Sequence, residues 1–166
     1  MKGKTIFITG ATSGIGEGCA RKFTSAGCRL ILNGRNVEKL EALKRELVLS
    51  GCEVLTLPFD VRDREAMKLA LDSLQEEWKN IDVLINNAGL VIGLDKEHEG
   101  SLDEWDVVID TNIKGLLAMT RMVVPGMVER QCGHIINIGS VAGDAAMQVE
   151  VCIVQRKQQS KHCPTD

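Results

Sequence analysis

The sequence predicts an α/β fold built on a doubly wound parallel sheet, and three observations support this prediction. Short apolar runs alternate along the chain with longer segments whose apolar residues recur at helical spacing. A glycine-rich turn follows the first apolar run. The runs are continuous in apolar residues, as is typical of parallel strands covered on both faces. Strands that alternate with helices form right-handed crossover units, and a doubly wound sheet is their common arrangement.

The first predicted strand is Thr5–Ile8, and glycines recur after it at Gly10, Gly14 and Gly16. Glycine permits a positive φ and lets a ligand approach the backbone, because it has no Cβ. A helix that begins at such a turn presents unpaired N–H groups and the positive end of its dipole. The turn Gly10–Gly16 is therefore predicted to bind a phosphate, as in Rossmann-type folds, and an ordinary strand–turn–helix connection is the alternative.

Periodicity and capping residues define the remaining elements. Asp63 can cap one helix, and Ser101 with Glu104 forms a capping box before another. Gly27 and Gly51 each follow a helical pattern, as glycines at helix C-termini do. The predicted helices are 15–26, 37–49, 64–78 and 102–130. The other predicted strands are 28–32, 53–58, 81–85 and 134–138, with a turn over 33–36 and a loop over 90–100.

The carboxyl ends of these strands define a predicted ligand site. Doubly wound sheets bind ligands in the crevice beyond those ends, at the point where the strand order reverses. The residues expected there are Gly10–Gly16, Asn33–Asn36, Asp60, Asn86–Gly89 and Ser140.

Composition narrows the classes of partner and location. The chain has 166 residues, 44% of them hydrophobic and 26% charged, which fits one globular domain. Its net charge of −3 provides no basic stripe, so no nucleic-acid partner is expected. The first strand begins near Met1 and no apolar run is long enough to cross a membrane, so we expect a cytoplasmic protein without a leader. The six cysteines form no C-x-x-C pair, so reduced thiols and no metal site are expected.

Four motifs in order resemble those of the short-chain dehydrogenase/reductase family, over residues 4 to about 145. Thr9–Gly16 (TGATSGIG) resembles its glycine turn, and Asn86–Gly89 its NNAG motif. Asn112, in DTNIKG, resembles its helix asparagine, and Ser140, in IINIGS, its catalytic serine. The wording GRNVEKLEAL, PGMVER and HIINIGS is most similar to the bacterial NADP-dependent 3-hydroxy acid (serine/threonine-type) dehydrogenase branch.

The resemblance implies hydride transfer between NADP(H) and a small hydroxyl or carbonyl substrate, in relatives that form homo-oligomers. It implies that Ser140 hydrogen-bonds the substrate carbonyl and its developing oxyanion. It also implies that Asn112 holds a water in a proton relay, and an asparagine satisfied inside a helix is the alternative. The implied cofactor-binding residues are Gly10, Ala11, Thr12, Ser13, Gly14, Ile15, Gly16, Arg35, Asn36, Asp60, Val61, Asn87, Ala88 and Gly89.

Arg35 bears on the choice between NADP and NAD. An acidic residue after the second strand would accept a hydrogen bond from a ribose 2′-hydroxyl, whereas an arginine suits a 2′-phosphate. No Asp or Glu lies between Leu30 and Val37, so NADP(H) is favoured over NAD, and a solvated surface arginine is the alternative. The resemblance places Asp60 at the adenine amino group with Val61 beside it, and a simple cap of the next turn is the alternative.

The resemblance breaks near Met147. The family's catalytic tyrosine would stand at Ile153, and the chain contains no tyrosine, although Lys157 stands at the position of the family's lysine. We therefore interpret residues 1–145 as an incomplete dinucleotide-binding domain, truncated after the fifth strand, and residues 146–166 as an aberrant polar tail. The fifth strand is then expected to be an exposed edge.

One hypothesis for this tail is a shifted reading frame. If one base were lost just before the Met147 codon, the former frame would permit a tyrosine codon at position 153 and a lysine codon at position 157. Sequencing the encoding DNA tests this hypothesis. As written, the chain is expected to be an inactive oxidoreductase, and a non-catalytic dinucleotide-binding module is the alternative.

Overall fold

The computed structural model describes residues 1–93 and 98–140. Five parallel strands form one sheet in the order β3-β2-β1-β4-β5. The chain moves outward from β1 to β3, returns to the other side of β1 at β4, and continues to β5. This order confirms the predicted doubly wound sheet. The strands are β1 (Thr5–Ile8), β2 (Arg29–Gly34), β3 (Val54–Pro58), β4 (Val83–Asn86) and β5 (His134–Asn137).

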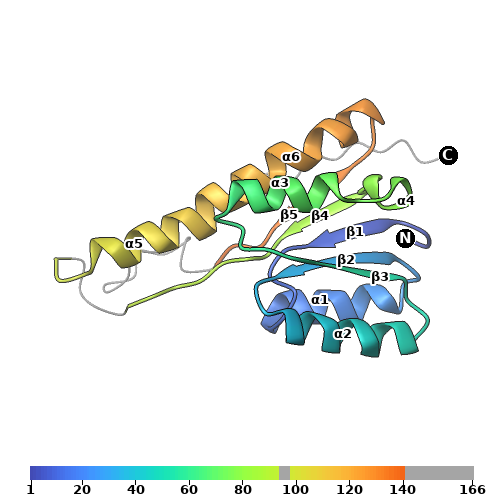
Figure 1. The fold of residues 1–166 in the computed structure, drawn as a ribbon, viewed down its shortest axis with the longest axis horizontal. Coiled ribbons are helices and arrows are strands. Elements are labelled where there is room, and N and C mark those ends of the chain that lie inside the picture. Colours follow the sequence, from blue (N-terminus) through green and yellow to red (C-terminus); the bar gives the residue numbers. More distant parts are fainter. Residues whose placement is uncertain (94–97, 141–166) are drawn as a thin grey trace.

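Helices cover both faces of the sheet (Figure 1). One face carries α1 (Gly14–Thr24) and α2 (Val37–Leu49). The other face carries α3 (Arg64–Asp72), α4 (Glu76–Lys79) and α6 (Leu116–Glu129), while α5 (Leu102–Ile109) extends beyond one end of the sheet. Among the residues described, no helix is both long and apolar enough to cross a membrane.

Two apolar cores lie on opposite faces of the sheet, and β1 contributes to both. Ile6 and Ile8 pack into the core under α1 and α2, while Phe7 packs into the core under α3 and α6. All three side chains are completely buried. Successive residues of a strand point to opposite faces, so a strand buried on both faces must be continuously apolar.

The second strand is longer than predicted. Asn33 and Gly34 were expected in a turn, but they extend β2 and pair with Leu57 and Pro58. The buried Asn33 side chain donates hydrogen bonds from Nδ2 to the carbonyl oxygens of Leu57 and Phe59, at 3.0 and 3.1 Å. An asparagine thus remains in a strand because its amide has partners on the neighbouring segment.

The predicted single helix over 64–78 is wrong, because it is broken into α3 and α4. The Ser73 hydroxyl donates a 2.7 Å hydrogen bond to the Ala70 carbonyl, and Gln75 is extended with ψ 155°. The break lets Leu74 enter the core with 6% of its surface exposed. It also places Trp78 under the Arg29 guanidinium, 4.3 Å from the ring centroid, in a cation–π contact.

The predicted helix over 102–130 has nearly the expected extent but is not uniform. Between α5 and α6, the six residues of η1 (Asp110–Gly115) form a π-helical segment. The Ser101 hydroxyl accepts a hydrogen bond from the Glu104 N–H at 3.5 Å, consistent with the expected capping box. π segments inside α-helices are often found at functional sites.

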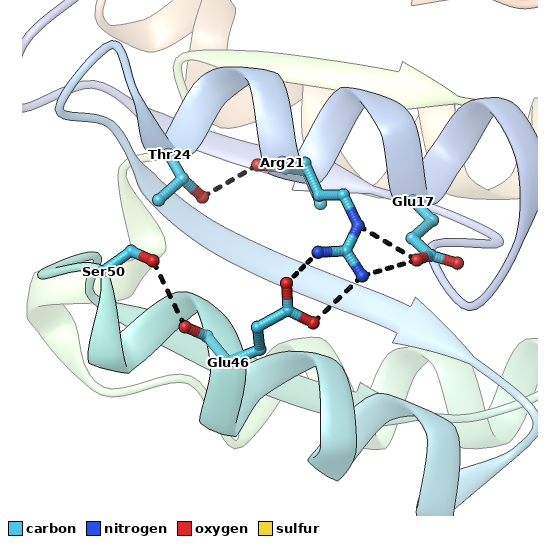
Figure 2. Close-up of polar contacts among 6 residues, drawn as sticks. Glu17, Arg21, Thr24, Glu46 and Ser50 are labelled. Carbon is cyan, nitrogen blue, oxygen red and sulfur yellow. Dashed lines mark hydrogen bonds and ion pairs between the residues drawn. The ribbon is translucent and has the colours of Figure 1, made fainter.

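Arg21 links α1 to α2, the two helices that share one face of the sheet (Figure 2). From α1 its guanidinium donates to Glu17 of the same helix at 2.7 Å, and it also contacts Glu46 of α2. The two carboxylates raise the pKa of Arg21. These side chains are well exposed, so water and salt screen the contact, and the buried apolar stripe remains the main link of each helix to the sheet.

Candidate functional site

A pocket of about 520 Å³ lies at the carboxyl ends of the strands. It is lined by segments that follow β1, β2, β3, β4 and β5, together with one face of the long α5–η1–α6 rod. The predicted site residues that line it are Gly10, Thr12, Ser13, Gly14, Ile15, Asn33, Gly34, Arg35, Asp60, Val61, Asn86, Asn87, Ala88, Gly89, Asn112 and Ser140.

Three predicted cofactor-binding residues do not line the pocket. Ala11 is completely buried, and its N–H donates to the Asn33 carbonyl at 2.8 Å. Gly16 is buried in the first turn of α1. Asn36 caps α2 by accepting a 2.9 Å hydrogen bond from the Lys39 N–H. These residues shape the elements around the pocket rather than its surface.

The glycine turn brings the start of α1 close to the backbone after β4. Gly10 and Gly14 have φ of +64° and +54°, a conformation that residues with a Cβ rarely adopt. At Gly16 a Cβ would lie 2.4 Å from both the Gly10 carbonyl oxygen and Asn87 Nδ2. The Ser13 side chain makes no capping hydrogen bond to α1. The helix N-terminus therefore opens at the pocket without a side-chain cap.

Thr9 locks this turn to the segment that follows β4. Its hydroxyl accepts hydrogen bonds from the N–H groups of Asn87 and Ala88, at 2.9 and 3.0 Å, and donates to the Ile85 carbonyl at 3.3 Å. In return, Asn87 Nδ2 donates to the carbonyls of Thr9 and Gly10, both at 3.0 Å. The glycine turn and the NNAG motif thus form one hydrogen-bonded unit.

Two arginines flank Asp60 at the end of the pocket beyond β2 and β3. Arg62, through Nη2, lies 2.6 Å from the Asp60 carboxylate, and its backbone N–H donates to the same carboxylate at 3.0 Å. Arg35 is farther away, with 3.8 Å between Nη1 and Oδ2. The Arg62 hydrogen bond lowers the pKa of Asp60. Sequence reasoning missed Arg62, although its spacing of two residues from an aspartate suits a local turn contact.

Asn112 fastens the loop after β4 to the π segment. Its Oδ1 accepts from the Leu90 N–H at 2.9 Å, and its Nδ2 donates to the Leu90 carbonyl at 2.8 Å. Its side-chain amide is therefore hydrogen-bonded to another segment of the chain. Ser140 lies after β5 at the same pocket and is exposed.

An apolar wall of the pocket was not predicted. Val108, Thr111 and Leu116 line it from the same helix face as Asn112. Counted from Val108, the other three follow at three, four and eight residues, a spacing that could have identified this face. Val91 adds to it from the loop after β4. The remaining unpredicted lining residues are Phe59, Leu90, Ile138 and Gly139.

Metal binding finds no support in the part of the chain that the structure describes. Within residues 1–93 and 98–140, no group of three or more His, Cys, Asp or Glu residues is arranged to hold an ion. Residues 146–166, with Ile153 and Lys157, lie outside the described residues.

The chain is similar to NADP-dependent dehydrogenases. NADP-dependent 3-hydroxy acid dehydrogenase YdfG from Salmonella typhi is 54% identical over 138 residues, which are 83% of this chain and 54% of that protein. Serine 3-dehydrogenase from Rhizobium radiobacter is 44% identical over the same shares. A solved structure of the closed form of serine dehydrogenase complexed with NADP+ has a TM-score of 0.82 and 49% identity, covering 86% of this chain and 56% of that chain.

The matches cover most of this chain but only part of each relative. The chain spans about half the length of the curated relatives it matches. The family profile described as short chain dehydrogenase matches residues 4–152, nearly the whole chain. With the parallel sheet, the glycine turn and the pocket now described, the chain belongs to the short-chain dehydrogenase family.

Proposed function

We propose that the pocket binds NADP(H), with its diphosphate over Thr12–Ile15. The observation that carries this proposal is the glycine turn. Ser13, Gly14 and Ile15 line the pocket there, and the Ser13 side chain makes no capping hydrogen bond to α1. The amides of this first helical turn are suited to a diphosphate, because they offer unpaired donors at the positive end of a helix dipole. The NADP-dependent 3-hydroxy acid dehydrogenase and the serine dehydrogenase complexed with NADP+ named above support the same cofactor.

The adenosine half of the cofactor would lie toward Arg35 and Asp60. Arg35 follows β2, lines the pocket and has 64% of its side chain exposed, so its guanidinium is accessible to a 2′-phosphate. Arg62 uses three donors on Asp60, namely its backbone N–H, Nε and Nη2, which leaves about one of the roughly four acceptor positions of the carboxylate. Asp60 is thus suited to the adenine amino group with Val61 beside it. NAD is the less favoured cofactor.

The nicotinamide half would lie toward Asn87–Gly89 and Ser140. Asn87, Ala88 and Gly89 carry the backbone along the pocket wall, and the Ser140 hydroxyl is exposed at the same cavity. Ser140 would hydrogen-bond a substrate carbonyl, and Asn112 would order the loop and a relay water beside it. The bound cofactor would supply hydride transfer to or from a small hydroxyl or carbonyl substrate, of which the hydroxy acids in the relatives' names are examples.

We further propose that this chain binds the dinucleotide without turning a substrate over. The family's general acid/base is a tyrosine, and Ile153 at that position has no dissociable proton. A non-catalytic dinucleotide-binding module is therefore the second candidate function. Exposed apolar side chains on the long rod, at Leu102, Leu117 and Val128, are compatible with the homo-oligomers expected of the relatives.

The test is an NADPH fluorescence titration of the full chain and of Ile15→Glu. Ile15 is 61% exposed at the pocket, in the first turn of α1. A carboxylate there is stabilised by the helix dipole but repels a diphosphate. The variant therefore stays folded, and its affinity for NADPH falls at least about tenfold. Ile15→Gln, which is neutral, is the matched control and retains binding.

The outcomes separate the candidates. Binding by the unsubstituted chain, with no NADPH oxidation or NADP+ reduction when 3-hydroxy acids or their keto acids are supplied, supports binding without turnover. Measurable turnover contradicts the proposed inactivity. No binding at saturating NADPH, or equal binding by Ile15→Glu and Ile15→Gln, contradicts the proposed site.

A further inference from the structure

The charged residues at the adenosine end of the pocket are arranged asymmetrically. Asp60 and Arg35 line the pocket, whereas Arg62 stands behind Asp60 and does not line it. Arg62 Nε lies 3.1 Å from each carboxylate oxygen of Asp60, and Nη2 lies 2.6 Å from Oδ2. A planar guanidinium that meets both oxygens of a carboxylate is the strongest form of this contact.

Arg35 forms only a long ion pair with Asp60. It approaches Asp60 only to 3.8 Å, beyond hydrogen-bond distance, and its side chain is more exposed than that of either partner: 64% against 26% for Asp60 and 35% for Arg62. The Asp60 carboxylate is thus engaged by the arginine behind it. The arginine in the pocket is left accessible to a ligand.

The charge on Asp60 affects how well Arg35 can bind a phosphate. A bare Asp60 carboxylate would repel a phosphate bound by Arg35 and would also compete with that phosphate for the Arg35 guanidinium. With Arg62 in place the three side chains carry one net positive charge. The mutual hydrogen bonds lower the pKa of Asp60 and raise that of Arg62, so both groups stay ionised.

We propose that Arg62 is a positioning residue for cofactor choice: by holding and neutralising Asp60, it keeps Arg35 free for the 2′-phosphate and so favours NADPH over NADH. The inference rests on the proposed function. It makes Arg62 part of the selectivity without any contact between Arg62 and the cofactor. Loss of Arg62 would release Asp60 to pair with Arg35.

The experiment measures dissociation constants of NADPH and NADH for the full chain and for Arg62→Gln. The substitution raises the dissociation constant of NADPH about tenfold and leaves that of NADH within about twofold, because only NADPH carries the 2′-phosphate. Arg64→Gln is the matched control. Arg64 is exposed at the first residue of α3, two residues away, and its substitution leaves both constants unchanged.

A second background separates positioning from a general effect on the fold. Asp60→Asn removes the charge that Arg62 neutralises. Adding Arg62→Gln to this variant therefore changes the ratio of the NADPH and NADH dissociation constants by less than about twofold. Equal weakening of both cofactors by Arg62→Gln, no change in either, or an undiminished effect in the Asp60→Asn background overturns the inference while the proposed function stands. No binding of either cofactor by the unsubstituted chain overturns both.

Discussion

β1 and β5 are parallel strands of equal length, yet they sit in different environments. β1 pairs with β2 on one side and β4 on the other, and each of its residues is buried. β5 pairs with β4 and, within the described residues, forms an edge of the sheet. Every residue of β5 is half-buried. The comparison therefore sets a fully enclosed strand against a partly enclosed one.

The difference bears on what each strand positions. β1 leads into the glycine turn, which Thr9 and Asn87 hold by hydrogen bonds on both sides. β5 leads to Ser140, which is exposed. Segments with few buried contacts open more readily than those in a core. The part of the pocket that follows β1 is thus held more firmly than the part that follows β5.

The largest effect is expected from a substitution in the glycine turn that follows β1. Gly16→Ala would place a Cβ 2.4 Å from the Gly10 carbonyl oxygen, a backbone atom that cannot move away cheaply. We expect the free energy of unfolding to fall by about 4 kcal/mol, measured by urea denaturation, with loss of NADPH binding.

Gly18→Ala is the matched control for that substitution. Gly18 lies in the same helix, and a Cβ there meets nothing within 4 Å. Because alanine is the better helix former, we expect this variant to gain up to about 1 kcal/mol. Equal destabilisation of the two variants would contradict the close packing at Gly16.

The second prediction measures the comparison itself. Ile8 in β1 is completely buried, whereas Ile136 in β5 is half-buried and contacts the same core. We expect Ile8→Ala to cost about 3 kcal/mol of unfolding free energy and Ile136→Ala about 1 kcal/mol, because less apolar surface is returned to water at β5. Similar losses at both positions would mean that β5 is as well enclosed as β1.

Parts of this contrast could be predicted from the sequence. Strands such as Thr5–Ile8 were predicted because burial on both faces demands a continuous apolar run. The helix Val37–Leu49 was predicted with both ends right, because its apolar spacing is regular and a glycine follows it. The glycine turn, Arg35 and Ser140 were placed at one pocket because parallel strands end at the same edge of a sheet.

Features set by contacts distant in the sequence escaped prediction. The break after Asp72 has no glycine or proline to mark it, and it follows from burial of Leu74. The π segment around Asn112 accompanies hydrogen bonds to Leu90, which lies 22 residues away in the chain. Arg62 was missed because its role depends on where the Asp60 carboxylate points. Local patterns define the elements, and tertiary contacts modify them.

The third prediction weakens the link between β1 and the segment after β4. Thr9→Val keeps the shape of the side chain but removes the acceptor of the Asn87 and Ala88 N–H groups. Two part-buried donors lose their partner, so we expect a loss of about 2 kcal/mol in unfolding free energy, measured by urea denaturation. Thr9→Ser keeps the hydroxyl and should cost less. If valine were tolerated as well as serine, the hydrogen bonds would not explain the firmness of this part of the pocket.

The smallest effect is expected from the ion pair between Asp60 and Arg62. Arg62 holds the pKa of Asp60 below its ordinary value of 3.8, so the pair adds stability above that pH, and this is lost as the pH falls through the lowered pKa. Because both side chains are partly exposed, we expect Arg62→Gln to cost less than about 1 kcal/mol at pH 7. Urea denaturation at about pH 7 and pH 2.5 should show the gap from the unsubstituted chain closing in acid. Arg64→Gln should show no such gap at either pH, and a gap for Arg62→Gln that widened in acid would reverse the sign of the assigned interaction.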